Sequence, residues 1–257
     1  MDQVRVGLQI HSLREDFAEK PAETLARIAA MGYEGVEFTL GSIRRDPAYF
    51  RELLTANGLA CFGCLTGWQD VQPESIAETI ACNRALGSPF VVIGSVPVKL
   101  VSTPGEVDDV LARMALAQRT IQAEGFATGY HNHDSDFFHV VGGKTFFEQV
   151  FDRTSDDFVM LLDTGNALAA GFESIPLFEK YPHRSPFLHI KGYSQAKGYL
   201  AYIGEDDFDW PAVIRCAIAT GGARTFSVEF GARGDYDPYE RAQTSLNRVR
   251  TYLEAAQ

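Results

Sequence analysis

Four short apolar segments in the second half of the chain each end in residues that could bind a metal or move a proton. They read GYHNHDSD (129–136), LLDTGN (161–166), LHIKG (188–192) and SVEFG (227–231). The residues of interest are His131, Asp163, His189 and Glu229. Imidazole and carboxylate without thiolate suit Mn, Co, Fe, Zn or Mg. We therefore predict one divalent metal ion held by these four side chains.

Each ligand has an alternative interpretation when it is taken alone. Asp163, before Thr-Gly-Asn, could cap the next helix or turn. His189 lies inside an apolar run and could be a core histidine with satisfied hydrogen bonds. Glu229 lies between Val228 and Phe230, where a buried carboxylate must be paired or bound to a metal. Because all four follow equivalent segments, the metal site explains them better than four coincidences.

Two further side chains point the same way as these ligands. His133 shares the parity of His131, and Lys191 shares that of His189, so the pleat of a strand directs each pair to one face. We expect His133 and Lys191 to act in acid–base chemistry. A buried lysine can have a depressed pKa; the alternative for Lys191 is a salt bridge at the rim.

The first half of the chain offers candidates for substrate binding. Glu37 ends the second apolar segment, and Gln9 and His11 end the first. Trp68 follows the third and could form an apolar wall against a bound ligand, although packing is the alternative. At the fifth segment, Asp136 is a further candidate.

Eight strand-like segments alternate with eight helical ones, which predicts the elements that position these residues. The expected strands are 4–10, 35–38, 60–64, 90–94, 126–133, 158–163, 187–191 and 225–230. The expected helices are 21–31, 46–57, 73–86, 104–124, 143–152, 173–181, 209–220 and 238–255. Eight βα units predict a single α/β domain over 1–257, a (β/α)8 TIM barrel whose site lies at the carboxyl ends of the strands. A doubly wound sheet is the alternative, but no G-x-G-x-x-G follows the first strand.

Composition and charge exclude several kinds of binding partner. A formal net charge of −11 and no basic run argue against nucleic acid. No apolar run approaches the length of a membrane span, and MDQVRVGLQI shows no leader, so we expect a cytoplasmic protein without a membrane partner. Cys61 and Cys64 form a CxxC, for which buried free thiols are a better interpretation than a zinc or redox site. The oligomeric state cannot be read from the sequence, so a homo-oligomer stays open.

A family resemblance now becomes clear. VGLQIHSLRED, GYEGVEF, GYHNHDSDF, DTGNALAAG, LHIKG, GEDDFDW and SVEF resemble, in order along the chain, the sugar phosphate isomerase/epimerase family with the xylose isomerase-like barrel. The resemblance implies metal ligands Glu, Asp, His and Glu from strands five to eight, of which the last three fall on Asp163, His189 and Glu229. Strand five differs, because this chain reads YHNHD. Either His131 takes the ligand position or Asp136 folds back to supply it.

The resemblance implies a metal-dependent isomerase or epimerase that acts on a sugar or keto-polyol through a metal-stabilised enediolate. Glu229 would remove the proton next to the carbonyl, and His133, His131 or Lys191 would return it. One alternative is a lyase or dehydratase on a keto-sugar, which needs no second carboxylate base. A further alternative is a non-catalytic sugar-binding protein. A DNA-repair endonuclease is another, but the acidic charge of the chain argues against it.

A phosphate on the substrate would need an anion site, for which only Arg233, in GARGD (231–235), offers a weak signal. We expect an unphosphorylated sugar.

Overall fold

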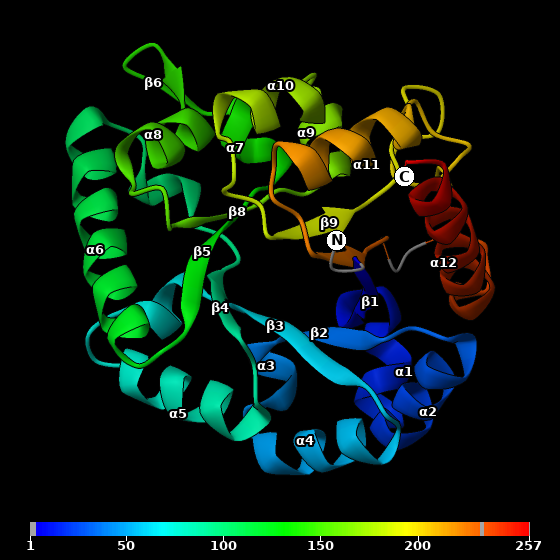
Figure 1. Cartoon of the computed structure of the whole chain (residues 1–257). Helices are drawn as coiled ribbons and strands as arrows, with labels where there is room; N and C mark the ends of the chain where they lie inside the picture. The colour runs from blue at the N-terminus through cyan, green and yellow to red at the C-terminus, as the bar shows by residue number, and fades with distance from the viewer. Residues whose placement is uncertain (1–3, 232–233, 257) are drawn as a thin grey trace.

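The computed structural model describes residues 4–231 and 234–256, so Arg233 lies outside the described residues. Its centre is one parallel sheet in the order β8-β5-β4-β3-β2-β1-β10-β9. The strands are β1 Arg5–Gln9, β2 Gly35–Thr39, β3 Ala60–Thr66, β4 Phe90–Ile93, β5 Ala127–His131, β8 Val159–Leu161, β9 Phe187–Ile190 and β10 Thr225–Val228. The sheet curls into a nearly closed barrel (Figure 1), which confirms the predicted (β/α)8 TIM barrel.

Helices surround the strands, as Figure 1 shows. Those that follow the predicted pattern are α2 Pro21–Met31, α4 Pro47–Ala56, α5 Ile76–Leu86, α6 Pro104–Ala123, α8 Phe146–Arg153, α10 Ser174–Lys180, α11 Trp210–Ala219 and α12 Pro238–Ala255. Their ends have local causes. The Thr103 hydroxyl accepts from the amide of Glu106 at the start of α6, and Gly32 ends α2 with a φ of 97°.

Several short elements between strands and helices were not predicted. They are η1 Ile10–Leu13, α1 Arg14–Glu19, α3 Leu40–Ile43, η2 Trp68–Val71, η3 Val98–Leu100, α7 Asp134–Phe138, α9 Thr164–Ala169, and the hairpin of β6 Val140–Val141 and β7 Lys144–Thr145. Each begins within a few residues of a strand or helix end, and η1, α7 and α9 follow strands that carry predicted site residues. These turns are too short for the periodicity of apolar residues to reveal them.

The barrel closes between β8 and β9 without a continuous ladder. The amide of His189 donates to the carbonyl of Leu162 at 2.9 Å, and the amide of Met160 donates to that of Arg184 at 2.6 Å. An isolated parallel bridge joins Asp163 to His189. Two of the predicted metal ligands therefore form the pair at which the barrel closes.

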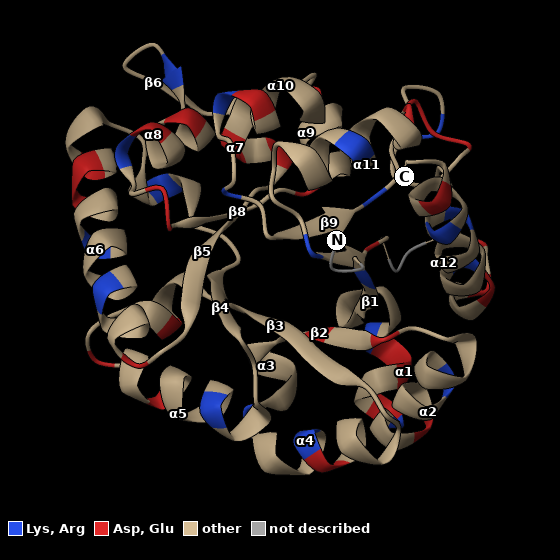
Figure 2. Cartoon of the chain, in the orientation of Figure 1, with Lys and Arg blue, Asp and Glu red and all other residues tan. Residues whose placement is uncertain are grey.

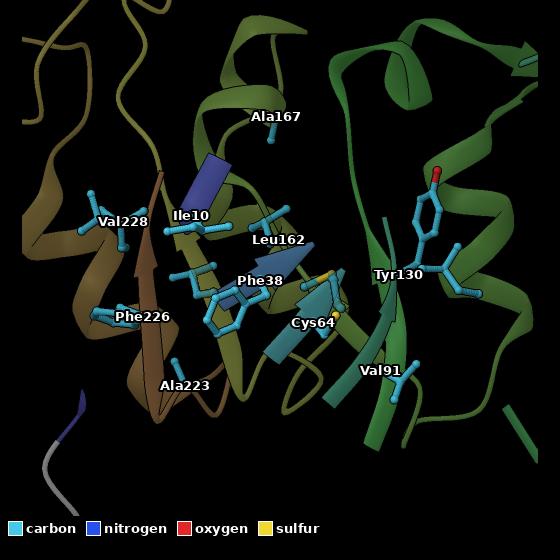
Figure 3. Packing of buried hydrophobic residues seen from close by; sticks show 14 of the residues in the cluster. Ile10, Phe38, Cys64, Val91, Tyr130, Leu162, Ala167, Ala223, Phe226 and Val228 are labelled. Carbon is cyan, nitrogen blue, oxygen red and sulfur yellow. The ribbon is translucent and has the colours of Figure 1, made fainter. Parts of the chain in front are cut away.

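Two hydrophobic layers hold the strands in place. The larger one lies between strands and helices, and Figure 3 shows part of it, including Phe38, Val91 and Phe226 from three different strands. The smaller one comprises Phe62, Val92, Val159, Leu161 and Phe187, whose positions alternate along the strands with those of the larger layer. The barrel interior below the strand ends is thus a packed core, as expected for this fold.

Charged residues are distributed over the outside of the barrel. In Figure 2 strands β3, β4, β5 and β8 carry no Lys, Arg, Asp or Glu, whereas helices such as α4 and α6 carry both signs. Over the described part of the chain, no helix combines the length and apolar character needed to cross a membrane.

Gly129 of β5 provides a test of the barrel packing. A Cβ there would lie 1.9 Å from the carbonyl oxygen of Val159 on β8, a backbone atom that cannot move aside. We expect Gly129→Ala to lower the free energy of unfolding by several kcal/mol, at the upper end for single substitutions (about 4 kcal/mol). Denaturant unfolding measures this. Gly105→Ala is the control, because a Cβ at Gly105 has no neighbour within 4 Å; equal stability of the two variants would contradict the packing.

Candidate metal centre

The four predicted ligands lie together at the carboxyl ends of their strands. One nitrogen or oxygen atom from each of His131, Asp163, His189 and Glu229 lies within 4.8 Å of the other three, and all four residues are buried. Asp163 Oδ2 lies 3.6 Å from His131 Nε2 and 3.7 Å from His189 Nδ1. Bonds of about 2.0–2.2 Å to a divalent cation place its ligand atoms about 3–4 Å apart, which is close to the spacing found here.

The donor atoms in this cluster lack the hydrogen bonds that buried polar atoms normally make. Within residues 4–231 and 234–256, no hydrogen bond satisfies His131 Nε2, Asp163 Oδ2 or His189 Nδ1. His189 Nδ1 lies 2.9 Å from Glu229 Oε2, but not in hydrogen-bonding geometry. Since buried polar atoms almost always have partners, these residues fit a bound cation, and His131, Asp163, His189 and Glu229 could hold one.

Lys191 balances the negative charge of the cluster. Its Nζ lies 2.9 Å from Glu229 Oε1 and 3.3 Å from Asp163 Oδ2. Burial raises the pKa of both carboxyls, but Lys191 and the neighbouring histidines outweigh it, so the pKa of Asp163 is lowered and that of Glu229 falls well below its usual value.

Lys191 does not have the depressed pKa that a buried lysine can have, and its ion pairs agree with the alternative of a salt bridge. Burial lowers its pKa, but the charges of Asp163 and Glu229 outweigh burial and raise it. The side chain is therefore a cation beside the cluster.

Two asparagines that sequence reasoning missed hold Asp163 in place. The Asn132 side chain accepts from the amide of Asp163 at 2.8 Å and donates to its carbonyl at 3.2 Å. Asn166 donates to the Asn132 carbonyl at 3.0 Å and accepts from Lys191 Nζ at 3.2 Å. Both asparagines stand inside segments that were singled out, HNH and DTGN, so their polar character after a strand was an available signal.

His131 also has its orientation set by a backbone group. Its Nδ1 lies 3.3 Å from the carbonyl oxygen of Gly94, which can only accept, so Nδ1 carries the hydrogen. The lone pair of Nε2 then faces Asp163 and the cluster.

His133 lies beside the cluster without joining it. Its ring centroid is 4.9 Å from that of His131, in an edge-to-face arrangement. The residue is exposed to solvent, yet protein surrounds most of its ring, and this burial lowers its pKa to about 4. His133 is therefore neutral at neutral pH and able to accept a proton.

Tyr199 is another residue that sequence reasoning did not find. Lys191 Nζ lies 5.2 Å from the centre of its ring, and its hydroxyl donates to Asp134 Oδ2 at 3.4 Å. Buried Arg241 of α12 donates to the carbonyls of Tyr199 and Ala201, which anchors this part of the β9–α11 connection.

Two predicted substrate-binding residues, Asp136 and Glu37, have partners inside the protein. Asp136 is buried; its Oδ2 accepts from the Tyr130 hydroxyl at 3.0 Å and the His133 amide at 2.8 Å, so it does not reach the cluster. The structure therefore brings His131, not Asp136, to the strand-five position of the cluster. Glu37 accepts from His189 Nε2 at 2.6 Å and is fully buried, whereas a role in binding substrate hydroxyls requires exposure.

The remaining candidates differ in exposure. Gln9 is buried and accepts from the amide of His11. His11 is exposed, and Glu229 and Lys191 are close enough to influence its pKa, which burial lowers. Trp68 is 4% exposed and packs within the larger core, where it offers little surface to a ligand.

The cysteines have no catalytic environment. Cys61, Cys64, Cys82 and Cys216 are free thiols, and burial raises the pKa of Cys61 to about 12, so that its thiolate is suppressed. The interpretation of CxxC as part of the packing of β3 agrees with this.

Comparison with known proteins places this site in a family. The family model described as xylose isomerase-like TIM barrel matches residues 25–252, and the chain belongs to that family. Comparison with the curated proteins found no match.

Solved structures of this fold resemble the chain over nearly its whole length. A sugar phosphate isomerase/epimerase from Parabacteroides distasonis has a TM-score of 0.81 at 20% identity, covering 98% of this chain and 96% of that one. An L-ribulose 3-epimerase has a TM-score of 0.74 at 17% identity, with 99% and 96% covered. A 3-keto-D-glucoside 4-epimerase from E. coli has a TM-score of 0.72 at 13% identity, with 97% and 100% covered. At these identities the likeness shows the fold.

Asp136 allows a test of the site's electrostatics through the pH dependence of stability. Burial raises its pKa to about 6 from a usual value of 3.8. The folded protein therefore binds more protons than the unfolded chain between about pH 4 and 6, and this carboxyl's contribution to stability falls as pH rises through that window. Asp136→Asn keeps an oxygen acceptor for Tyr130 and His133 but has no charge to bury.

We expect Asp136→Asn to match the wild type near pH 4 and to exceed it above pH 6, by up to about 3 kcal/mol for two pKa units. Thermal unfolding from pH 4 to 8 measures the difference, with Asp134→Asn as a control. A stability difference independent of pH would contradict the raised pKa.

Proposed function

We propose that this protein is a metal-dependent isomerase or epimerase that acts on a sugar or keto-polyol through an enediolate. The single observation that carries the proposal is the cluster of His131, Asp163, His189 and Glu229 with its unsatisfied donor atoms. Membership of the xylose isomerase-like family and the names of the structurally similar epimerases support it. A divalent metal, when bound, supplies Lewis acidity that polarises a carbonyl and stabilises the negative charge developing on its oxygen.

The surrounding residues divide the proton chemistry between them. His133 is neutral because its pKa is lowered to about 4, and its ring is accessible, so we assign it proton transfer at the carbon next to the carbonyl. Glu229 is buried and accepts a hydrogen bond from Lys191. We assign it two roles: it binds the metal, and it accepts a proton as the second proton-transfer group beside His133. Lys191 stays charged and stabilises negative charge on the substrate.

A second candidate is a lyase or dehydratase on a keto-sugar or keto-glycoside. The observation that favours it is His131 on β5, where the family resemblance implies a second metal-binding glutamate. Epimerisation by two carboxylates on opposite faces of the substrate lacks one of them here. Elimination requires only one base and one acid: neutral His133 can accept the proton next to the carbonyl and, once protonated, donate it to the leaving group.

Metal content tests the cluster directly. We expect about one Mn, Co, Fe, Zn or Mg ion per chain in protein purified without a histidine tag, as for a single catalytic site. Asp163→Asn and Glu229→Gln each replace one ligand and should lose most of the ion, while the exposed control Glu205→Gln should keep it. Elemental analysis measures the ratio. Wild-type protein that takes up no metal under any loading condition would exclude this chemistry and favour a non-catalytic sugar-binding protein.

Removal of His133 tests the proton transfer. We expect His133→Asn to retain the metal but to exchange substrate protons at least about 10²-fold more slowly, the usual effect of losing a general acid–base group. The assay is deuterium incorporation from D₂O into ketoses and 3-keto-glycosides, followed by mass spectrometry. Mass spectrometry also distinguishes an epimerase from a lyase, since elimination releases a leaving group and so changes the mass of the substrate.

The matched control is His183→Asn, since His183 is an exposed histidine in the connection between α10 and β9. It should behave as the wild type. Unchanged exchange in His133→Asn would reassign the proton transfer to Glu229.

A further inference from the structure

Glu37 is a buried carboxylate whose hydrogen bond goes to a candidate metal ligand. It lies on β2, three strands from β9 in the order of the sheet, and its side chain and that of His189 are both fully buried. Oε2 of Glu37 lies 2.6 Å from Nε2 of His189. A carboxylate oxygen accepts this bond, so Nε2 carries the hydrogen.

This bond decides which nitrogen of His189 faces the cluster. With Nε2 directed to Glu37, Nδ1 points to Glu229 Oε2 at 2.9 Å and to Asp163 Oδ2 at 3.7 Å. Nδ1 is one of the donor atoms without a hydrogen bond in the described residues. A ring flip would turn carbon atoms toward the cluster and toward Glu37.

We propose that Glu37 is the positioning residue of the metal centre: through His189 Nε2 it sets the orientation and tautomer that present Nδ1 to the ion. The inference rests on the proposed metal centre. Carboxylates that bind the far nitrogen of a metal-bound histidine hold the ring in place and increase its basicity. Glu37 acts through His189 and does not itself touch the substrate.

The packing around Glu37 supports this role. Burying a carboxylate is costly unless it is paired. Within the described residues His189 supplies the only hydrogen bond of the Glu37 carboxylate, whose Oε1 has none. On the remaining sides His189 is held by aromatic rings, with Phe187 at 5.9 Å and His131 at 4.6 Å between centroids. These contacts restrict the position of the ring but do not distinguish its two nitrogens. Among the described residues, Glu37 distinguishes the two nitrogens, because it forms a hydrogen bond with Nε2.

The experiment compares the metal affinity of the metal-free full-length protein with that of its variants. Glu37→Gln keeps the size and an oxygen acceptor but removes the charge; Glu37→Ala removes both. Glu34→Gln is the control, because Glu34 lies just before the same strand and bonds to the amide of Val6, away from the cluster. Co²⁺ is titrated without substrate and followed by its visible absorption, and circular dichroism and thermal unfolding of the metal-free proteins report the fold.

We expect Glu37→Gln to bind Co²⁺ about 10-fold more weakly and Glu37→Ala about 100-fold more weakly, the range known for such partners, with Glu34→Gln unchanged. Metal-free Glu37→Gln should be as stable as the wild type, since a merely structural role would instead lower its unfolding temperature. Affinity of folded Glu37→Gln within twofold of the wild type would overturn the inference.

The result separates this inference from the proposed function. Tight wild-type Co²⁺ binding that weakens in Glu37→Gln supports the inference even if no sugar is turned over, and then only the proposed function fails. Wild-type protein that binds no Co²⁺ overturns both.

Discussion

The mouth of the barrel is organised by the cost of burying carboxylates. Glu37, Asp163 and Glu229 are almost entirely removed from solvent, and an isolated buried carboxylate is too costly to persist. Around Asp163 and Glu229 the compensation comes from Lys191 and two imidazoles, and for Glu37 it comes from His189. These side chains come from five different strands or strand ends, so the charges can balance only when the whole barrel has formed.

The same residues also complete the barrel. Asp163 and His189 form the bridge where β8 meets β9, and the Asn132 side chain bonds to both backbone groups of Asp163. The Asn132 bonds continue the pairing of β5 with β8 beyond the end of its backbone ladder. Closure of the barrel therefore fixes the positions of Asp163 and His189. This favours a site that is formed before an ion binds.

His131 gives the site an asymmetry with consequences for its chemistry. On one side of the cluster, Lys191 and Glu229 form a charged pair; on the other, His131 and His133 provide imidazoles in edge-to-face contact. Neutral His133 can accept one proton from the substrate, while the Lys191 ammonium keeps its own. This division of roles is compatible with epimerisation and with elimination, which share the removal of a proton next to a carbonyl.

Much of the architecture was determined by local sequence. Short apolar runs alternate with amphipathic ones, and caps such as Thr103 and Gly32 mark helix ends, because period and capping depend on neighbours in the chain. Residue type at equivalent strand ends was also enough to predict that His131, Asp163, His189 and Glu229 share one site. The parallel strands then had to place them at the same edge.

Only the tertiary structure decided what each polar residue does there. Glu37 and Asp136 were candidates for substrate contact, but their partners come from distant strands or a neighbouring loop, and both are buried. The pKa of Lys191 is raised, not depressed, because two carboxylates from other strands outweigh its burial. Asn132 gains its role from Asp163 after the neighbouring strand β8, and Tyr199 is held near Lys191 by Arg241 of α12. Such roles depend on distance and desolvation between residues far apart in the chain, and neither quantity is encoded in local spacing.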